Sequence, residues 1–184
     1  MSATPIDVIG FWRISGPEKW FRKDYRFDAA IRLRFEPVHF AAARGEYSGW
    51  IQTSEGCLAL LLLLDQFPRN LWRGSPHAFA ADAMARSVAR HAVQADFDQE
   101  VEPGLRAFCY MPFMHSEDLG DQDLAVRLCE ALRDATGDEK TLQFAIIHRD
   151  IIDRFGRFPH RNAMMGRETT PDEQAFLDDG GFAG

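Results

Sequence analysis

The sequence has few cysteines and no long apolar run, and each shortage excludes a class of protein. The three cysteines, Cys57, Cys109 and Cys129, are too few and too widely spaced for a disulfide framework or a zinc knuckle. The longest apolar run, residues 57–64, is far shorter than the roughly 20 residues of a membrane span. Residues 1–7 show no basic region followed by an apolar run, so we expect no signal peptide. We therefore expect core thiols, a cytoplasmic location and no membrane partner.

Positively charged residues are also fewer than negatively charged ones. The 21 lysines and arginines are outnumbered by 28 aspartates and glutamates, which leaves a net charge of −7. A nucleic-acid-binding protein normally presents a basic face, so we expect no nucleic-acid partner. With 46% hydrophobic and 27% charged residues, the composition is that of an ordinary soluble globular protein. The length of 184 residues predicts a single domain, 1–184, of unknown oligomeric state.

The sequence lacks any sustained alternation of apolar and polar residues, so we expect no β-strand and an all-α fold. Apolar residues at positions 27, 31 and 35 recur at helical spacing instead. Pro37 is expected to interrupt that helix before a second helical piece reaches Gly45. Residues 1–50 also carry an aromatic layer that is expected to pack on the core: Trp12, Trp20, Phe21, Phe27 and Phe35.

The central helix of the fold is expected at residues 57–64, because this stretch is apolar all round. Thr53 or Ser54 caps its start, and Pro68 is expected to end it. Asp65 lies in its last turn, where an acid opposes the helix dipole and borders the most apolar stretch of the chain. Such an acid requires a cationic partner. The sequence offers four candidates for it: Arg69, Arg73, Arg154 and Arg161.

Capping residues place three later helices. Ser75-Pro76 is expected to open a helix that runs to about Asp96. Ser116 is expected to cap a helix that runs to Gly137. Thr170-Pro171-Asp172-Glu173 forms a capping box that opens a last short helix. Residues 178–184, rich in Gly and Asp, are expected to form a loosely ordered tail.

Eight of the fifteen residues in the segment 148–162 can carry charge. If residues 141–155 form a helix, His148 lies in the middle of its apolar face, and Gly156 stops the helix. That face consists of Phe144, Ile147, Ile151, Ile152 and Phe155, whereas Asp150, Asp153 and Arg154 lie outside it. Buried polar groups need partners because an unpaired buried charge is costly. The segment therefore predicts a buried helix end with several polar contacts.

One motif occurs twice along the chain. Phe67-Pro68-Arg69-Asn70 and Phe158-Pro159-His160-Arg161-Asn162 both close an apolar helix with Phe-Pro and then place Arg-Asn outside it. Helix ends that repeat in this way are typical of helical-repeat architectures, although no regular period is visible. An Asn after an Arg can also simply cap the free carbonyl groups of a helix end. A structural role and a ligand site both stay open for this motif.

Fragments of known catalytic motifs occur, but none is complete. His148-Arg149-Asp150 resembles a kinase catalytic loop, yet no Lys or Asn follows at the required offsets, and there is no glycine-rich phosphate loop. His115-Ser116-Glu117 resembles half of a zinc deaminase motif, but no Pro-Cys-x-x-Cys follows. There is no Walker A loop, Gly-x-Ser-x-Gly elbow or His-Glu-x-x-His. We predict no cofactor from these motifs.

Longer motifs resemble a known family. They are Asp65-Gln66-Phe67-Pro68-Arg69-Asn70, Met111-Pro112-Phe113-Met114-His115-Ser116-Glu117, the whole segment 148–162 and Gly180-Gly181-Phe182. Together they resemble the uncharacterised bacterial family known as domain of unknown function 924, and the likeness covers nearly the whole chain. The resemblance implies a tetratricopeptide-like array of antiparallel helix pairs around a central apolar helix. It implies no biochemical activity and no catalytic residues.

The first hypothesis for function is a pocket for a small anionic ligand, formed where the polar helix ends converge. Arginines would hold a carboxylate or phosphate, and a histidine would act as general acid or base beside a carboxylate. The catalytic candidates are His148, His115, Asp65 and Glu117. The ligand-binding candidates are Arg69, Asn70, Arg154, His160, Arg161 and Asn162.

Two other hypotheses compete with this one. The same polar residues could be internal struts of a tetratricopeptide-like module that presents a groove to a peptide partner. A weaker alternative is a metal-dependent enzyme that uses His115, Glu117 and His148 with Asp65 or Asp150. The spacing lacks the Glu-x-x-His pairs of di-iron helical bundles, so no residue is assigned to a metal. Whether the protein is an enzyme is left open by the sequence.

Overall fold

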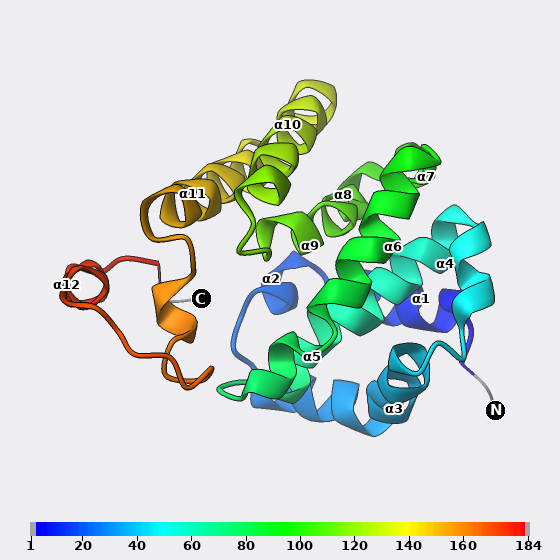
Figure 1. The fold of residues 1–184 in the computed structure, drawn as a ribbon. Coiled ribbons are helices and arrows are strands. Elements are labelled where there is room, and N and C mark those ends of the chain that lie inside the picture. The colour runs from blue at the N-terminus through cyan, green and yellow to red at the C-terminus, as the bar shows by residue number, and fades with distance from the viewer. Residues whose placement is uncertain (1–2, 183–184) are drawn as a thin grey trace. The chain divides into compact units, whose positions relative to one another are not determined.

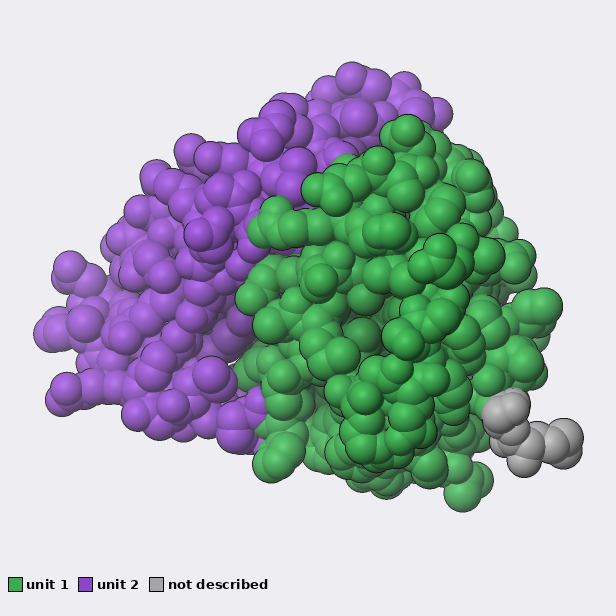
Figure 2. Space-filling view, turned by 45° about the vertical axis from the view of Figure 1, so that its right-hand side comes forward, with its two compact units in different colours: residues 1–73, 77–112 green, residues 74–76, 113–184 purple. Residues whose placement is uncertain are grey.

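The structure is a computed structural model that describes residues 3–182. Its regular elements are helices, and no strand occurs within this range, which confirms the all-α prediction (Figure 1). The chain divides into two compact units, which Figure 2 shows in different colours. Unit 1 comprises residues 1–73 and 77–112, and unit 2 comprises residues 74–76 and 113–184. The finer prediction of a tetratricopeptide-like array stays a prediction.

Unit 1 contains most of the helices. They are α1 (Pro5–Ser15), α2 (Pro17–Trp20), α3 (Tyr25–Ala43), α4 (Ser54–Leu61), α5 (Phe67–Leu71), α6 (Asp82–Gln94), α7 (Phe97–Glu100) and α8 (Pro103–Arg106). Short 3-10 helices occur at Ser48–Gln52, Pro76–Phe79 and Ala107–Cys109. The short helix α9 (Met111–Met114) spans the boundary between the units. Unit 2 contains α10 (Leu119–Thr136), α11 (Glu139–Phe155), a 3-10 helix at Pro159–Arg161 and α12 (Pro171–Asp178).

Proline positions account for two corrections to the predicted helices. Helix α3 runs through Pro37 without a break, so the predicted interruption is wrong. Proline removes one helical hydrogen bond, the one to the carbonyl four residues earlier. That carbonyl belongs to Leu33, whose residue is 85% exposed, so water can replace the missing N–H. Pro68 does not end the central helix either, because the helix continues through it to Leu71 as α5.

The central helix contains a wider turn that the sequence analysis did not foresee. Thr53 caps α4, and the helix then passes through a π-helical turn at Leu62–Gln66 before it continues as α5. The Nδ1 of His39 donates a hydrogen bond of 2.8 Å to the carbonyl of Leu63 in this turn. Turns of this kind are often found at functional sites. Here the turn places Asp65 and Gln66 side by side in the interior of unit 1.

Two later helix starts also differ from the prediction. The helix expected from Ser75-Pro76 begins as a 3-10 turn, and α6 starts only at Asp82. Ser116 does not cap α10, because the side chain of Asp118 accepts the hydrogen bond from Asp121 N–H there. Helix α6 begins after Ala81 with no side-chain cap. At α10 the sequence offers two nearby capping residues, Ser116 and Asp118, and propensity alone does not choose between them. The predicted ends at Gly137 and Gly156 are confirmed, since both adopt left-handed backbone angles (φ 80° and 67°).

The core of unit 1 is built on the central helix. Leu61, Leu62 and Leu63 are fully buried, and α4 packs against α1 and α6. The predicted aromatic layer packs beside them, with the ring of Trp12 centred 5.5 Å from those of Phe67 and Phe108. Most members of this layer are buried or half-buried, but Phe21 is 62% exposed. No helix within residues 3–182 is long and apolar enough to cross a membrane.

Unit 2 is a helix hairpin followed by a C-terminal segment. Helix α10 packs along α11, and the two lie side by side in Figure 1. Ile151, Ile152 and Phe158 form a small core, against which three half-buried aromatic residues pack: Phe155, Phe176 and Phe182. The predicted capping box at Thr170 is confirmed at the start of α12. Of the tail expected at residues 178–184, residues 183–184 lie outside the described part of the chain.

Candidate functional site

Unit 1 holds three of the predicted site residues, Asp65, Arg69 and Asn70. Asp65 is 1% exposed, and its carboxylate accepts a hydrogen bond of 2.5 Å from Gln66. Arg69 lies 3.2 Å from Asp65 and donates two hydrogen bonds of 3.1 Å to Asp82. Arg69 is thus a partner of Asp65, as the sequence analysis expected. Burial alone would lower the pKa of Arg69, but the charges of Asp65 and Asp82 raise it above its ordinary value.

Asn70 belongs to a second network in the same unit. Its side-chain amide donates a 2.8 Å hydrogen bond to Asp28 on α3. Arg73 binds the same carboxylate with two hydrogen bonds of 2.7 and 3.0 Å. Arg69 and Asn70 therefore hold the exit of the central helix to α3 and to the start of α6. Both networks connect helices of one unit, so they support a structural role for Arg69 and Asn70.

The remaining candidates all lie in unit 2, and three of them gather around one aromatic ring. The centre of the Phe158 ring lies 5.4 Å from that of His148 and 5.5 Å from that of His160. The guanidinium of Arg161 lies 4.3 Å from the same ring. His115 joins this group, since its ring is centred 6.3 Å from that of His148. We call His115, His148, His160 and Arg161 the histidine–arginine cluster.

Two side chains of the cluster donate hydrogen bonds to backbone carbonyls. The Nδ1 of His148 donates a 2.7 Å hydrogen bond to the carbonyl of Phe144. Because a carbonyl only accepts, this nitrogen carries a proton. Arg161 donates a 3.0 Å hydrogen bond to the carbonyl of His115. His148 and Arg161 are each only 7% exposed. The side chains are therefore fixed in an interior that excludes most water.

Glu117 positions Phe158 beneath the cluster. Its carboxylate accepts the backbone N–H of Phe158 at 2.9 Å and two hydrogen bonds from Arg167 at 2.7 and 3.0 Å. Burial alone would raise the pKa of Glu117, but these hydrogen bonds lower it below its ordinary value. Glu117 is therefore ionised near neutral pH. The sequence predicts Glu117 at the site but does not reveal Arg167, because no local pattern connects residues 50 positions apart.

Asn162 has a different environment from the one predicted. It is fully buried, and its amide donates hydrogen bonds of 3.2 Å to Glu173 and 3.4 Å to Thr169. Glu173 also receives two hydrogen bonds from Arg157, at 2.6 and 2.8 Å. The Arg157 bonds contribute most to lowering the pKa of Glu173 to about 2. Asn162 thus connects the segment after Phe158 to α12. The capping box revealed Glu173 in the sequence, but not its arginine.

Arg154 lies apart from the histidine–arginine cluster. Its guanidinium is 4.5 Å from the centre of the Phe155 ring and 5.8 Å from that of Phe176. Its side chain is exposed, in agreement with its predicted place outside the apolar face of the helix. The structure therefore gathers three histidines and Arg161, while Arg154 stacks on a neighbouring aromatic pair.

The pKa of His160 is strongly perturbed. Burial is the largest cause, and the charge of Arg161 is the next, so that the pKa of His160 is lowered to about 4. Its Nδ1 is buried without a hydrogen-bond partner among the described residues, and so is Oδ1 of Asn162. Buried polar atoms normally find a partner in the protein, a water molecule or a ligand. Both atoms are thus available for a further hydrogen bond.

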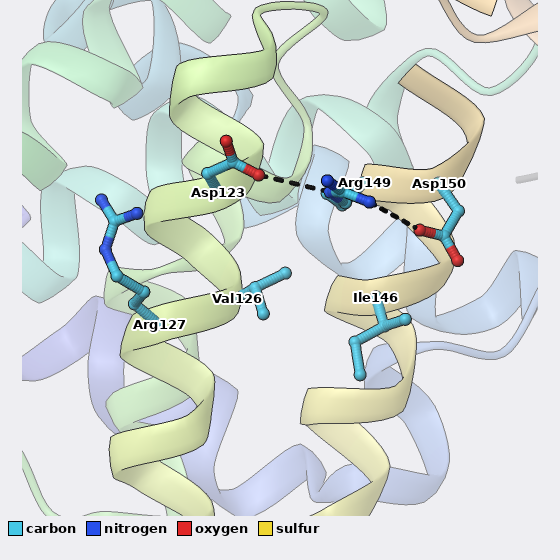
Figure 3. Close-up of a pocket in the computed structure, with 6 residues that line it drawn as sticks. All are labelled: Asp123, Val126, Arg127, Ile146, Arg149 and Asp150. Carbon is cyan, nitrogen blue, oxygen red and sulfur yellow. Dashed lines mark hydrogen bonds and ion pairs between the residues drawn. The ribbon is translucent and has the colours of Figure 1, made fainter. Parts of the chain in front are cut away.

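Other features of unit 2 are weaker candidates. A hollow of about 330 Å³ lies between α10 and α11, where Arg149 is 3.3 Å from both Asp123 and Asp150 (Figure 3). Another, of about 560 Å³, is lined by Arg157 and Arg167, which already bind glutamates. Within residues 3–182, no three or more His, Cys, Asp or Glu side chains are grouped as metal ligands. The metal hypothesis gains no geometric support from this part of the chain.

Comparisons with known proteins agree on the kind of protein but give no activity. The family model described as bacterial protein of unknown function (DUF924) matches residues 8–181. The solved structure of the protein of unknown function ATU0120 from Agrobacterium tumefaciens is similar, with 47% sequence identity and a TM-score of 0.91. That similarity covers 95% of this chain and 97% of the other. No curated protein matches.

Proposed function

This chain belongs to the bacterial family of proteins of unknown function DUF924, and we propose that its unit 2 binds a small anionic molecule. The observation that carries the proposal is the gathering of His148, His160 and Arg161 around Phe158, with His115 beside His148. Guanidinium and imidazole groups are the side chains that recognise carboxylate and phosphate oxygens. The predicted pocket is thus proposed for the histidine–arginine cluster, with Arg161 as the main anion-binding side chain.

Electrostatics in the cluster supports an anionic ligand. Burial is the largest cause of the lowered pKa of His160. The positive charges of Arg161 and Arg167 also lower this pKa, whereas the charge of Glu117 raises it. An anion beside His160 would lower this positive potential and favour the charged imidazolium. The buried Nδ1 of His160 and Oδ1 of Asn162 are further groups to which a ligand could hydrogen-bond.

The cluster also contains a side chain suited to proton transfer. His148 donates its Nδ1 proton to the carbonyl of Phe144, which fixes the orientation of its ring. We propose His148 as the general base if the bound anion is a substrate, with His115 as the second histidine at 6.3 Å. Glu117 and Asn162 would act by positioning Phe158 and the segment that follows it.

A thermal-shift screen with phosphorylated and carboxylated compounds tests this proposal. A ligand at a hundred times its dissociation constant adds about 2.7 kcal/mol to the stability, which raises the melting temperature by roughly 5–10 °C at this length. We expect Arg161→Gln to abolish that increment. Arg154→Gln removes an arginine from the same unit that lies outside the cluster, and it should keep the increment. Equal increments in both variants would place the ligand elsewhere.

A second candidate function is a peptide-binding module of tetratricopeptide type. It is favoured by the networks of unit 1, in which Arg69 and Asn70 act as struts. It is also favoured by exposed apolar residues on α11, since Phe144 and Ile147 are 39% and 42% exposed. Under this alternative, changing Phe144 and Ile147 together to Ser should abolish peptide binding. The same change should not alter the rise in melting temperature that anions cause.

A further inference from the structure

We propose that residues 180–182 close the histidine–arginine cluster, and that an anion reaches the histidines only when Phe182 moves away. This inference rests on the proposed function, because it describes how access to the same site is controlled. The residues concerned are Gly180, Gly181 and Phe182, a motif that the sequence analysis noted and the ligand hypothesis did not use.

Phe182 covers two histidines at once. Its ring centre lies 4.6 Å from that of His148 and 5.4 Å from that of His160. The same two imidazoles contact Phe158, at 5.4 and 5.5 Å. Each histidine therefore has an aromatic ring from the core and another from the C-terminal segment beside it. A charged ligand cannot occupy the place of a phenyl ring without displacing it, since desolvating an anion against an apolar group is costly.

The two glycines direct the chain onto the cluster. Gly180 follows α12 with φ of 80°, a left-handed conformation that other residues adopt only with strain. Gly181 donates a 2.9 Å hydrogen bond to the carbonyl of Phe176. A Cβ atom at Gly181 would lie 2.5 Å from that carbonyl oxygen and 2.6 Å from the Phe176 ring. The turn thus requires a glycine here, and Phe176 itself packs on Phe155, with ring centres 5.2 Å apart.

The closure is anchored lightly, as a movable element requires. Two backbone hydrogen bonds hold residues 180–182, from Gly180 to Leu177 at 3.2 Å and from Gly181 to Phe176 at 2.9 Å. The described side-chain contacts of Phe182 are with histidine rings and apolar core residues. Segments held by few hydrogen bonds open at low free-energy cost. The geometry therefore combines a defined closed position with a weak attachment.

Carbethoxylation of histidines by diethyl pyrocarbonate, read by peptide mass spectrometry, tests the closure without a known ligand. Phe182→Ala removes the covering ring, and Gly181→Val displaces the turn through its clash with Phe176. Phe21→Ala removes an exposed aromatic ring from unit 1 and serves as the matched control. All chains are compared at a temperature at which their measured unfolding curves show them folded.

We expect carbethoxylation of His148 and His160 to become roughly tenfold faster in both closure variants, because a local opening step is removed. The rates at His77 and His91, in unit 1, should not change, and Phe21→Ala should match the wild type. Unchanged rates at His148 and His160 in both closure variants would overturn the closure. If the rates rise but phosphate and citrate fail to slow them, the closure stands and the proposed anionic ligand is refuted.

Discussion

Arg167 binds the carboxylate of Glu117 with two hydrogen bonds, 2.7 and 3.0 Å long, although 50 positions separate them in the sequence. Glu117 also accepts the backbone N–H of Phe158. The pair therefore fixes the residue around which His148, His160 and Arg161 lie. The arrangement of the site thus depends on a contact between the start of the α10 region and the segment after α11.

Arg167→Met tests this structural role. The substitution keeps the apolar stem but removes both hydrogen bonds to Glu117, which is about 30% exposed in its side chain. We expect the free energy of unfolding to fall by about 2 kcal/mol in urea denaturation. Arg133→Met is the control, because Arg133 pairs with Asp134, whose side chain is 70% exposed. It should cost less than about 1 kcal/mol. Equal losses would show that the Glu117 pair is no more than a surface ion pair.

Arg69→Met tests whether the polar network of unit 1 is structural. Arg69 pairs with Asp65, which is buried in the core, and with Asp82. We expect a loss of about 3 kcal/mol of stability, since the substitution removes the arginine from a buried ion pair. The rise in melting temperature that anions cause should remain. Arg13→Met, at an exposed pair with Glu102, is the matched control and should have little effect. A variant that keeps its stability but loses the increment would assign Asp65 and Arg69 to the ligand site.

His160 predicts a pH dependence of stability. Its pKa is about 4 in the folded chain, against an ordinary value of 6.5 for a histidine in an unfolded chain. Between these values the unfolded chain binds the proton and the folded chain does not, so stability falls as the pH falls from 6.5 towards 4. His160→Gln should flatten the curve in this window only. Glu173 acts lower, because its pKa is about 2 and its ordinary value 4.5. Parallel curves for the variant and the wild type would contradict the burial of a neutral His160.

The three thiols should be unreactive in the folded chain. Cys57, Cys109 and Cys129 are buried, and burial raises the pKa of Cys57 to about 11 and that of Cys129 to about 12. The thiolate is the nucleophile, so both burial and a raised pKa slow the reaction. We expect no reaction with Ellman's reagent within minutes in native buffer and reaction of all three cysteines in denaturant. A fast-reacting native thiol would show that one of them is accessible.

Local signals in the sequence predicted helices and caps well. The left-handed ends at Gly137 and Gly156 and the capping box at Thr170 are each set by a few adjacent residues. The prediction at Pro37 failed because a single proline costs one hydrogen bond, which the packing of α3 outweighs. The π-helical turn at Asp65 was not predictable, since the same apolar run suits an ordinary α-helix.

The residue types that gather at the candidate site can be predicted from the sequence, but their partners cannot. Histidines and Arg161 stand near helix ends in the sequence, and the structure brings His148, His160 and Arg161 together around Phe158. The sequence does not reveal the contacts of Arg167 and Phe182, because these depend on tertiary geometry that no spacing encodes. The sequence makes Arg154 as good a ligand-binding candidate as Arg161, because it does not show towards which neighbours an arginine side chain near a helix end points.

The most direct test of anion binding at the cluster is to follow the histidine rings by two-dimensional ¹H–¹⁵N spectra during a phosphate titration. The chain has six histidines, with His39, His77 and His91 in unit 1 and His115, His148 and His160 in unit 2. We predict saturable shifts for the unit 2 histidines, with His160 becoming easier to protonate, and none for those of unit 1. Saturable shifts confined to the unit 1 histidines, or no saturable shift with phosphate or citrate, would contradict the proposed function.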